Sequence, residues 1–180
     1  MTRIVWTFGL ISGGIMAATM AISMMFADQI GFDRGAIIGY ATMILAFLVV
    51  YVGMRSYRDT VLAGVIGFGR AFKVGISITL IVSVCYVAAW EVIYHTMAPD
   101  FAEKYSAYAI EKTRASGASA AQIEAQRQKM TAFQEQYKNP LVNIGMTFLE
   151  VFPVGVVVVL VSAAVLSRRK ALPNVDVVRV

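Results

Sequence analysis

Charged side chains are scarce in this chain of 180 residues. Asp, Glu, Lys and Arg together make up 15% of the sequence, whereas hydrophobic residues make up 58%. Soluble domains carry about 25% charged residues and about 45 to 50% apolar ones. A soluble domain of this length buries only roughly 70% of its chain surface, so the excess apolar material needs another solvent. The composition therefore predicts an integral membrane protein whose main partner is the lipid bilayer.

Cysteine and histidine are almost missing, with one residue of each, Cys85 and His95. A single cysteine excludes a disulfide within the chain, and the pair excludes CxxC and HExxH motifs and any His and carboxylate set with metal spacing. The glycines at 64, 67 and 69 are followed by no GK[ST], so they predict a turn rather than a phosphate loop. We therefore expect no enzyme, no metal and no cofactor.

Four long stretches are nearly free of charge. A bilayer core about 30 Å thick needs roughly 20 helical residues, and four segments reach that length, at about 5–26, 36–54, 71–97 and 141–166. The first could be a cleaved signal peptide, but its apolar run is longer than the roughly 7 to 15 residues of such signals. We expect an all-α fold with one domain over 1–170, an integral membrane four-helix bundle.

The only sizeable polar part of the chain is the insertion 99–139 between the third and fourth spans. Its apolar residues recur at helical spacing, and Ser119 with Gln122 forms a capping box after Gly117, which predicts two short helices. We interpret the insertion as an extracytoplasmic helical hairpin, either a lid packed on the spans or a gate or docking surface. Its apolar stripes are Phe101, Tyr105 and Tyr108 in the first helix and Ile123, Met130, Phe133 and Tyr137 in the second.

Positive charges in the short loops set the expected orientation, because Lys and Arg near span ends stay in the cytoplasm. The basic flanks all fall on one side of the four-span arrangement, so both termini, including a flexible tail at 171–180, should be cytoplasmic. The net charge of +5 then reflects topology and anionic lipid, not nucleic acid. Short loops favour a bacterial inner membrane. The residues concerned are Arg3, Arg55, Arg58, Arg70, Lys73, Arg168, Arg169 and Lys170.

Small residues repeat at helical spacing in the first two spans. Helices in lipid associate through close backbone approach, so these ridges predict tight packing within the bundle, or alternatively the seam of a homo-oligomer. The ridges are Gly13, Ala17 and Ala21, Gly14 and Ala18, and Gly31, Gly35 and Gly39.

Two acidic residues, Glu91 and Glu150, lie inside predicted spans, where a charged group costs several kcal/mol unless it is paired, protonated or hydrated. Both fall in the outer half of the bilayer, and Glu91 has His95 one turn further on, at a spacing that allows contact. Glu150 lies about 13 Å into the fourth span. We hypothesise that the two carboxyl groups share one cavity.

Pro153 strengthens this hypothesis, because a proline within a helix leaves the carbonyl of Leu149 without its usual donor. With Thr147 and Tyr94 as hydrogen-bond partners, such a set could coordinate a cation or relay a proton. The alternative is structural: the carboxyl groups are protonated or hydrogen-bonded and only set the helix register.

Four sequence blocks resemble one family. They are YRD at 57–59, GFGRAF at 67–72, YVAAWE at 86–91 and, most specifically, NPLVNIGMTFLEVFPVG at 139–155. In these blocks the chain is similar to the bacterial membrane proteins grouped as domain of unknown function number 4199. The resemblance implies a four-span bundle with an external helical insertion, and it implies no established activity.

Two functions of different classes remain open. In one, the bundle is a small transporter or channel component in which Glu91 and Glu150 bind a cation or proton beneath the hairpin. In the other, it is a non-catalytic scaffold that binds an envelope protein or anionic lipid. The scaffold would use its hairpin or a cytoplasmic loop that carries Tyr57, Arg58, Asp59, Arg70 and Lys73.

Overall fold

A computed structural model describes residues 1–168, and over this range all regular secondary structure is α-helical, as the sequence predicts. Residues 169–180, with the expected cytoplasmic tail and two of the basic flank residues, lie outside the described part. The six helices are α1 (Thr2–Met25), α2 (Ala27–Val61), α3 (Phe68–Thr96), α4 (Phe101–Ala115), α5 (Ala120–Tyr137) and α6 (Pro140–Leu166).

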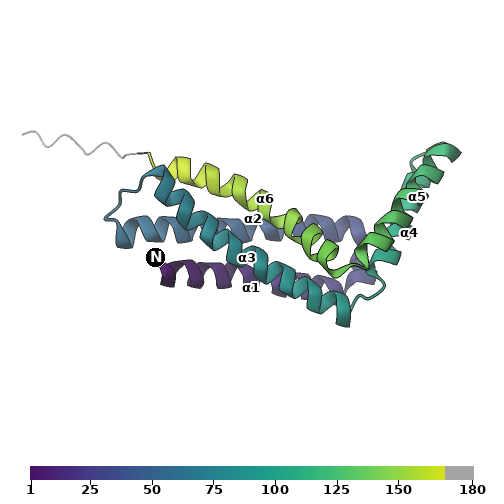
Figure 1. Cartoon of the computed structure of the whole chain (residues 1–180), viewed down its shortest axis with the longest axis horizontal. Coiled ribbons are helices and arrows are strands. Elements are labelled where there is room, and N and C mark those ends of the chain that lie inside the picture. The colour runs from purple at the N-terminus through teal and green to yellow at the C-terminus, as the bar shows by residue number, and fades with distance from the viewer. Residues whose placement is uncertain (169–180) are drawn as a thin grey trace, which may run out of the picture.

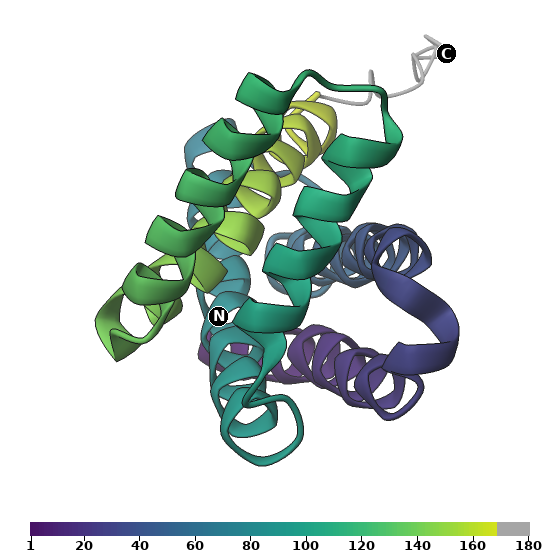
Figure 2. The same cartoon turned by 90° about the vertical axis from the view of Figure 1, so that its right-hand side faces the viewer.

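Four of these helices, α1, α2, α3 and α6, are long and apolar enough to cross a membrane. They run side by side along the long axis of the molecule (Figure 1), and α3 packs against each of the other three. The start of α1, the end of α6 and the α2–α3 connection lie together at one end. The shorter helices α4 and α5 lie across the opposite end (Figure 2).

The connection between α1 and α2 differs from the expectation. We expected a loop over 27–35, but α2 already begins at Ala27, so that only Phe26 separates the two helices. The direction of the chain changes instead at Gly31, which has φ 71° and ψ 164° inside α2. Only glycine adopts this backbone geometry without steric cost, so Gly31 permits the kink.

The connection between α2 and α3, which we expected to be a cytoplasmic loop, begins later than the YRD motif at 57–59 suggests. Tyr57, Arg58 and Asp59 lie in the last turns of α2, which ends at Val61, and Tyr57 is only 8% exposed. The prediction that these residues form a loop is therefore wrong. Tyr57 packs in the main apolar core because α2 continues for two turns past the segment that hydropathy alone assigns to the membrane.

Some glycines allow two helices to approach closely, whereas others contact no neighbouring helix. A Cβ added at Gly13 would lie 2.6 Å from the Cβ of Cys85, so this glycine lets α1 approach α3 closely. At Gly155 an added Cβ would overlap Thr79 on α3 and the ring of Phe47 on α2. By contrast, a Cβ at Gly14 on α1, or at Gly35 or Gly39 on α2, would meet nothing within 4 Å. Within one copy of the chain, only some of the predicted ridges pack.

The helices α4 and α5 form an antiparallel pair. Gly117, with φ 79°, makes the turn between them, and the predicted capping box at the start of α5 is confirmed: the Gln122 amide donates to Ser119 Oγ at 3.4 Å, and the Ser119 amide donates to Gln122 Oε1 at 2.8 Å. At the next helix start, Asn139 Oδ1 accepts from the Leu141 amide at 3.0 Å, and Pro140 occupies the first turn. These caps set where α5 and α6 begin.

Candidate functional site

A hydrogen-bonded group of side chains joins α3, α5 and α6 near the α4–α5 pair. The indole Nε1 of Trp90 on α3 donates to the hydroxyl of Tyr137 on α5 at 2.8 Å and to Oδ1 of Asn143 on α6 at 3.0 Å. All three side chains are buried, with 7%, 6% and 2% of their surface exposed. Because one indole donor serves an acceptor on each of two other helices, these hydrogen bonds hold α5 against α3 and α6.

Thr147 lies one turn beyond Asn143 and takes part in the same group. Its hydroxyl donates to the backbone carbonyl of Asn143 at 2.9 Å and lies 3.3 Å from Asn143 Oδ1. We expected the Thr147 hydroxyl to hydrogen-bond one of the carboxyl groups. In the structure it hydrogen-bonds Asn143 instead. Burial also raises the pKa of the Tyr137 hydroxyl, so this hydroxyl stays protonated at physiological pH.

Glu150 on α6 is an exposed residue, and the group beside its carboxyl is the hydroxyl of Tyr86 on α3. Glu150 follows Thr147 by three residues, so the carboxyl lies next to the turn that carries the hydrogen-bonded group. Pro153 lies inside α6 three residues further on and leaves the Leu149 carbonyl without a helical donor. The Glu150 carboxyl therefore lies beside a hydroxyl from α3, on a stretch of α6 that also carries the carbonyl freed by Pro153.

Glu91 has different surroundings. Its Oε2 lies 3.8 Å from Nδ1 of His95, and the same ring nitrogen lies 2.8 Å from the Glu91 carbonyl oxygen. The predicted contact between Glu91 and His95 is therefore present. Its other oxygen, Oε1, is buried and has no hydrogen-bond partner within residues 1–168. In that same part of the chain no hydrogen bond or ion pair joins Glu91 to Glu150, so each carboxyl has its own partner.

Aromatic rings surround the hydrogen-bonded group and connect it to α4. Tyr94 lies 5.5 Å from Tyr137 and 6.2 Å from Trp90, measured between ring centroids, so it packs here rather than beside a carboxyl. Phe101 lies edge-on to Trp90 at 4.7 Å. The predicted stripe of α4 thus faces the long helices. In α5 only Tyr137 contacts a long helix through its ring, whereas Phe133 packs within the α4–α5 pair. The rings, which we call the aromatic cluster, are Phe32, Trp90, Tyr94, Phe101, Tyr105, Tyr108, Phe133 and Tyr137.

A polar contact ties α4 to the start of α2. The Tyr108 hydroxyl and the Lys112 ammonium both donate to Asp33 Oδ1, and Lys112 also donates to Tyr108 at 2.8 Å. The bond to Asp33, followed by the bond to Tyr108, raises the pKa of the Lys112 ammonium, so the contact persists at neutral pH. It fastens the part of α2 that follows the Gly31 kink to the α4–α5 pair.

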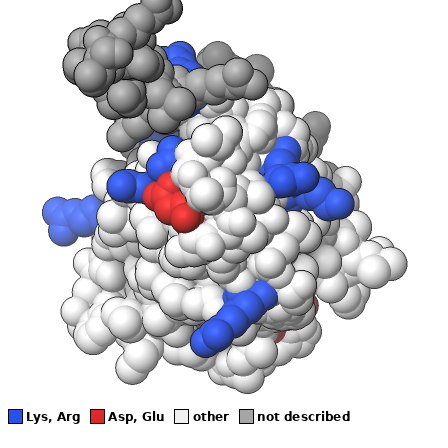
Figure 3. Space-filling view, turned by 90° about the vertical axis from the view of Figure 1, so that its left-hand side faces the viewer, with Lys and Arg blue, Asp and Glu red and all other residues white. Residues whose placement is uncertain are grey.

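The opposite end of the molecule is basic. Figure 3 shows Lys and Arg side chains spread over this end with few acidic ones between them. Arg55 and Arg58 both pair with the one carboxylate of Asp59, at 3.5 and 2.7 Å. The other two residues of the predicted loop motif, Arg70 and Lys73, are exposed in the first turns of α3. No three His, Cys, Asp or Glu side chains gather as metal ligands in the described range.

Sequence reasoning missed four residues of the site: Tyr86, Trp90, Tyr137 and Asn143. A helical spacing signal was available for them, because Tyr86, Trp90 and Tyr94 follow at intervals of four, as do Asn143 and Thr147. These residues were missed because charge in an apolar span was the signal for a site residue, and none of the four is charged. The carboxyl of Glu150 was found by its cost in lipid, whereas its partner hydroxyl carries no such cost.

The family model described as "Protein of unknown function (DUF4199)" matches residues 7–168, which covers all four long helices and the α4–α5 pair. No curated protein and no solved structure matches the chain.

Proposed function

The chain belongs to the DUF4199 family, and we propose that it is a small proton- or cation-linked transporter or channel component whose binding group is the Glu150 carboxyl. In this proposal the four long helices form a membrane bundle in a bacterial inner membrane. The basic end and both termini face the cytoplasm, and the α4–α5 pair is the extracytoplasmic hairpin. The basic end supports this orientation, since Lys and Arg near span ends are retained in the cytoplasm.

The observation that carries the proposal is the setting of Glu150. A carboxyl within a span is costly in lipid and persists where it faces water, a partner or a permeating ion. Glu150 is exposed, has the Tyr86 hydroxyl beside it, and lies ten residues after Pro140, about 15 Å along α6. The Leu149 carbonyl, left free by Pro153, is a second oxygen for a cation or for a water that carries a proton.

Glu91 does not belong to this site. Its oxygen Oε2 faces His95, and no described contact links it to Glu150. The site we propose therefore has one carboxyl instead of the two that the sequence suggested. A single carboxyl with a hydroxyl partner favours a proton or a monovalent cation, because a divalent ion held by the protein usually has more oxygen ligands.

The test is flux of protons and of K⁺ into proteoliposomes that contain wild type, Glu150→Gln or Tyr86→Phe. Glu124→Gln, an exposed carboxyl on α5, is the matched control, and thermal unfolding in detergent checks the fold of each variant. We expect flux in wild type and in the control, loss with Glu150→Gln and a weaker or pH-shifted flux with Tyr86→Phe. Absence of flux in folded wild type, or full flux in folded Glu150→Gln, would overturn the proposal.

A second function, a non-catalytic scaffold, is favoured by one observation. The hydrogen bonds of Trp90 hold α5 firmly, and the α4–α5 pair carries a groove of about 640 Å³ whose lining includes Ile110, Arg127 and Met130. A rigid surface with both apolar and charged groups suits an envelope protein partner. Loss of a co-purifying partner after Met130→Glu, with no flux in wild type, would favour this function.

A further inference from the structure

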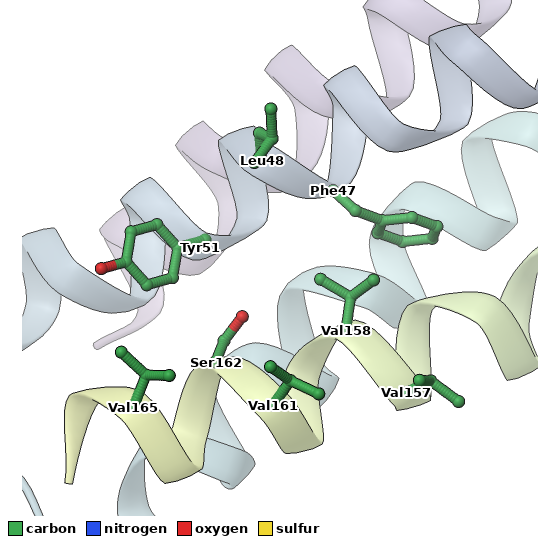
Figure 4. A pocket seen from close by; sticks show the side chains of 8 residues that line it. All are labelled: Phe47, Leu48, Tyr51, Val157, Val158, Val161, Ser162 and Val165. Atoms are coloured by element: carbon green, nitrogen blue, oxygen red, sulfur yellow. The ribbon is translucent and has the colours of Figure 1, made fainter. Parts of the chain in front are cut away.

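A groove lies between α2 and α6, on the part of the bundle that leads from Phe47 towards the basic end. Its volume is about 390 Å³, and it is lined by Phe47, Leu48 and Tyr51 from α2 and by Val158, Val161 and Val165 from α6. Figure 4 shows Phe47 and Tyr51 on the side of α2 that faces α6, with the valines of α6 below them. Apart from the hydroxyls of Tyr51 and Ser162, the walls are hydrocarbon, and the volume lies in the range of ligand pockets.

The groove begins beside a close contact between α2 and α6. At Gly155 the ring of Phe47 fits against the backbone of α6, and an added Cβ would lie 2.7 Å from that ring. Towards the basic end, α6 presents valines to α2, and no glycine allows closer approach there. The seam between α1 and α3, where Gly13 meets Cys85, is closed by contrast. The opening is therefore confined to one stretch, from Phe47 towards the ends of α2 and α6.

Each wall of the groove leads to an arginine. On α2, Arg58 follows Tyr51 by seven residues, about two helical turns, and so lies on the same face of the helix. On α6, Arg168 follows Val165 by three residues. Arg55 and Arg58 share the single carboxylate of Asp59, so this pair of arginines keeps a net positive charge. An apolar groove that ends near cationic groups suits a molecule with a long hydrocarbon tail and an anionic headgroup.

We propose that this groove binds one anionic phospholipid, with an acyl chain between α2 and α6 and its phosphate at Arg58 and Arg168. The charge at the end of the groove decides for an anionic phospholipid over a second helix, because a juxtamembrane Lys or Arg contributes about 1 kcal/mol towards an anionic headgroup. The lipid fills the seam that the helices leave open. This site is independent of Glu150 and needs no transport activity.

The test uses delipidated protein in detergent, titrated with phosphatidylglycerol or phosphatidylcholine and followed by native mass spectrometry and by Tm. We expect wild type to keep one phosphatidylglycerol at least tenfold more tightly than phosphatidylcholine. Val161→Phe should fill the groove and remove this bound lipid, whereas Val84→Phe, an equally lipid-exposed valine on α3, should not.

The headgroup contact is tested by the double variant Arg58→Gln and Arg168→Gln, with Arg34→Gln near the opposite end as the charge control. We expect the preference for phosphatidylglycerol to fall about tenfold in the double variant and to stay unchanged in the control. Equal binding of both lipids by wild type, or retention of the lipid by folded Val161→Phe, would overturn the proposal. Should the double variant keep its full preference, the phosphate does not lie at these arginines.

Discussion

The two ends of this molecule are held together by different physical means. Towards the basic end, the core is mostly aliphatic, with residues such as Val50, Ile78 and Val82, and the helices approach one another at glycines. At the end that carries α4 and α5, a separate core forms around Trp90 and Tyr137, with hydrogen bonds between side chains. Close packing alone holds the helices together towards the basic end. At the other end, close packing is combined with hydrogen bonds between side chains.

The proposed membrane arrangement accounts for this difference. Where a helix is surrounded by lipid tails, lipid competes equally well for apolar surface, so helices gain from close backbone contact and fit. Near the bilayer boundary, Trp and Tyr can bury their rings and still use their polar atoms. The end with polar contacts is also where an exposed carboxyl, Glu150, can be tolerated. This comparison makes three predictions, ordered by the size of the expected effect.

The largest effect is expected from a side chain added to a close helix contact. Gly13→Val places a Cβ 2.6 Å from Cys85, which must move, and we expect a loss of about 3 kcal/mol or failure to fold. Thermal unfolding in detergent measures it. Gly14→Val is the matched control, because its Cβ meets nothing within 4 Å and its effect should be near zero. An equal loss in both would mean that Gly14 packs against a second copy.

A smaller loss is expected in the polar core. Trp90→Phe keeps most of the ring but removes the donor to Tyr137 and Asn143, leaving buried acceptors unpaired, and we expect a loss of about 2 kcal/mol. Denaturant unfolding in detergent measures it, and Trp6→Phe, at an exposed tryptophan, is the control. A stability unchanged from wild type would show that Asn143 finds another donor and that the indole nitrogen is not needed at this end.

The smallest effect is expected at the exposed contact between α4 and α2. Asp33→Asn removes the charge that Lys112 faces, and since both side chains are solvent-exposed, global stability should barely change. Amide hydrogen exchange should instead become faster over α4 and the first turns of α2. Glu111→Gln, which affects only a pair within α4, is the control. Unchanged exchange in Asp33→Asn would show that the aromatic rings alone hold α4 in place.

Much of the secondary structure could be predicted from the sequence because lipid imposes a length and a composition on each span. The expected segment 141–166 lies within one residue of α6, Pro140–Leu166. The failures concern helix continuation: α2 extends past the apolar segment at both of its ends, through Asp28 and through Tyr57. Hydropathy marks where a helix is in lipid, and a helix can continue into water when its polar residues have no strong stop signal.

The candidate site was only partly predictable, for a related reason. Glu150 and Pro153 stand out in the sequence because each is unfavourable in an apolar helix. Tyr86, Trp90 and Asn143 break no such rule, and which of them meet depends on how α3 is rotated against α6. The idea of two carboxyls in one cavity failed to gain support from the structure because Glu91 faces His95 while Glu150 faces Tyr86.

The sequence by itself determined that the chain is helical, that four helices are long and apolar enough to cross a membrane, that Ser119 caps α5, and that charge gathers at one end. These are local properties, set by composition, spacing and capping within a few turns. Only the tertiary structure decided which glycines pack, which polar groups meet Trp90, and where α2 and α6 leave a groove. Those outcomes depend on helix rotation and separation, which side chains from several helices settle together.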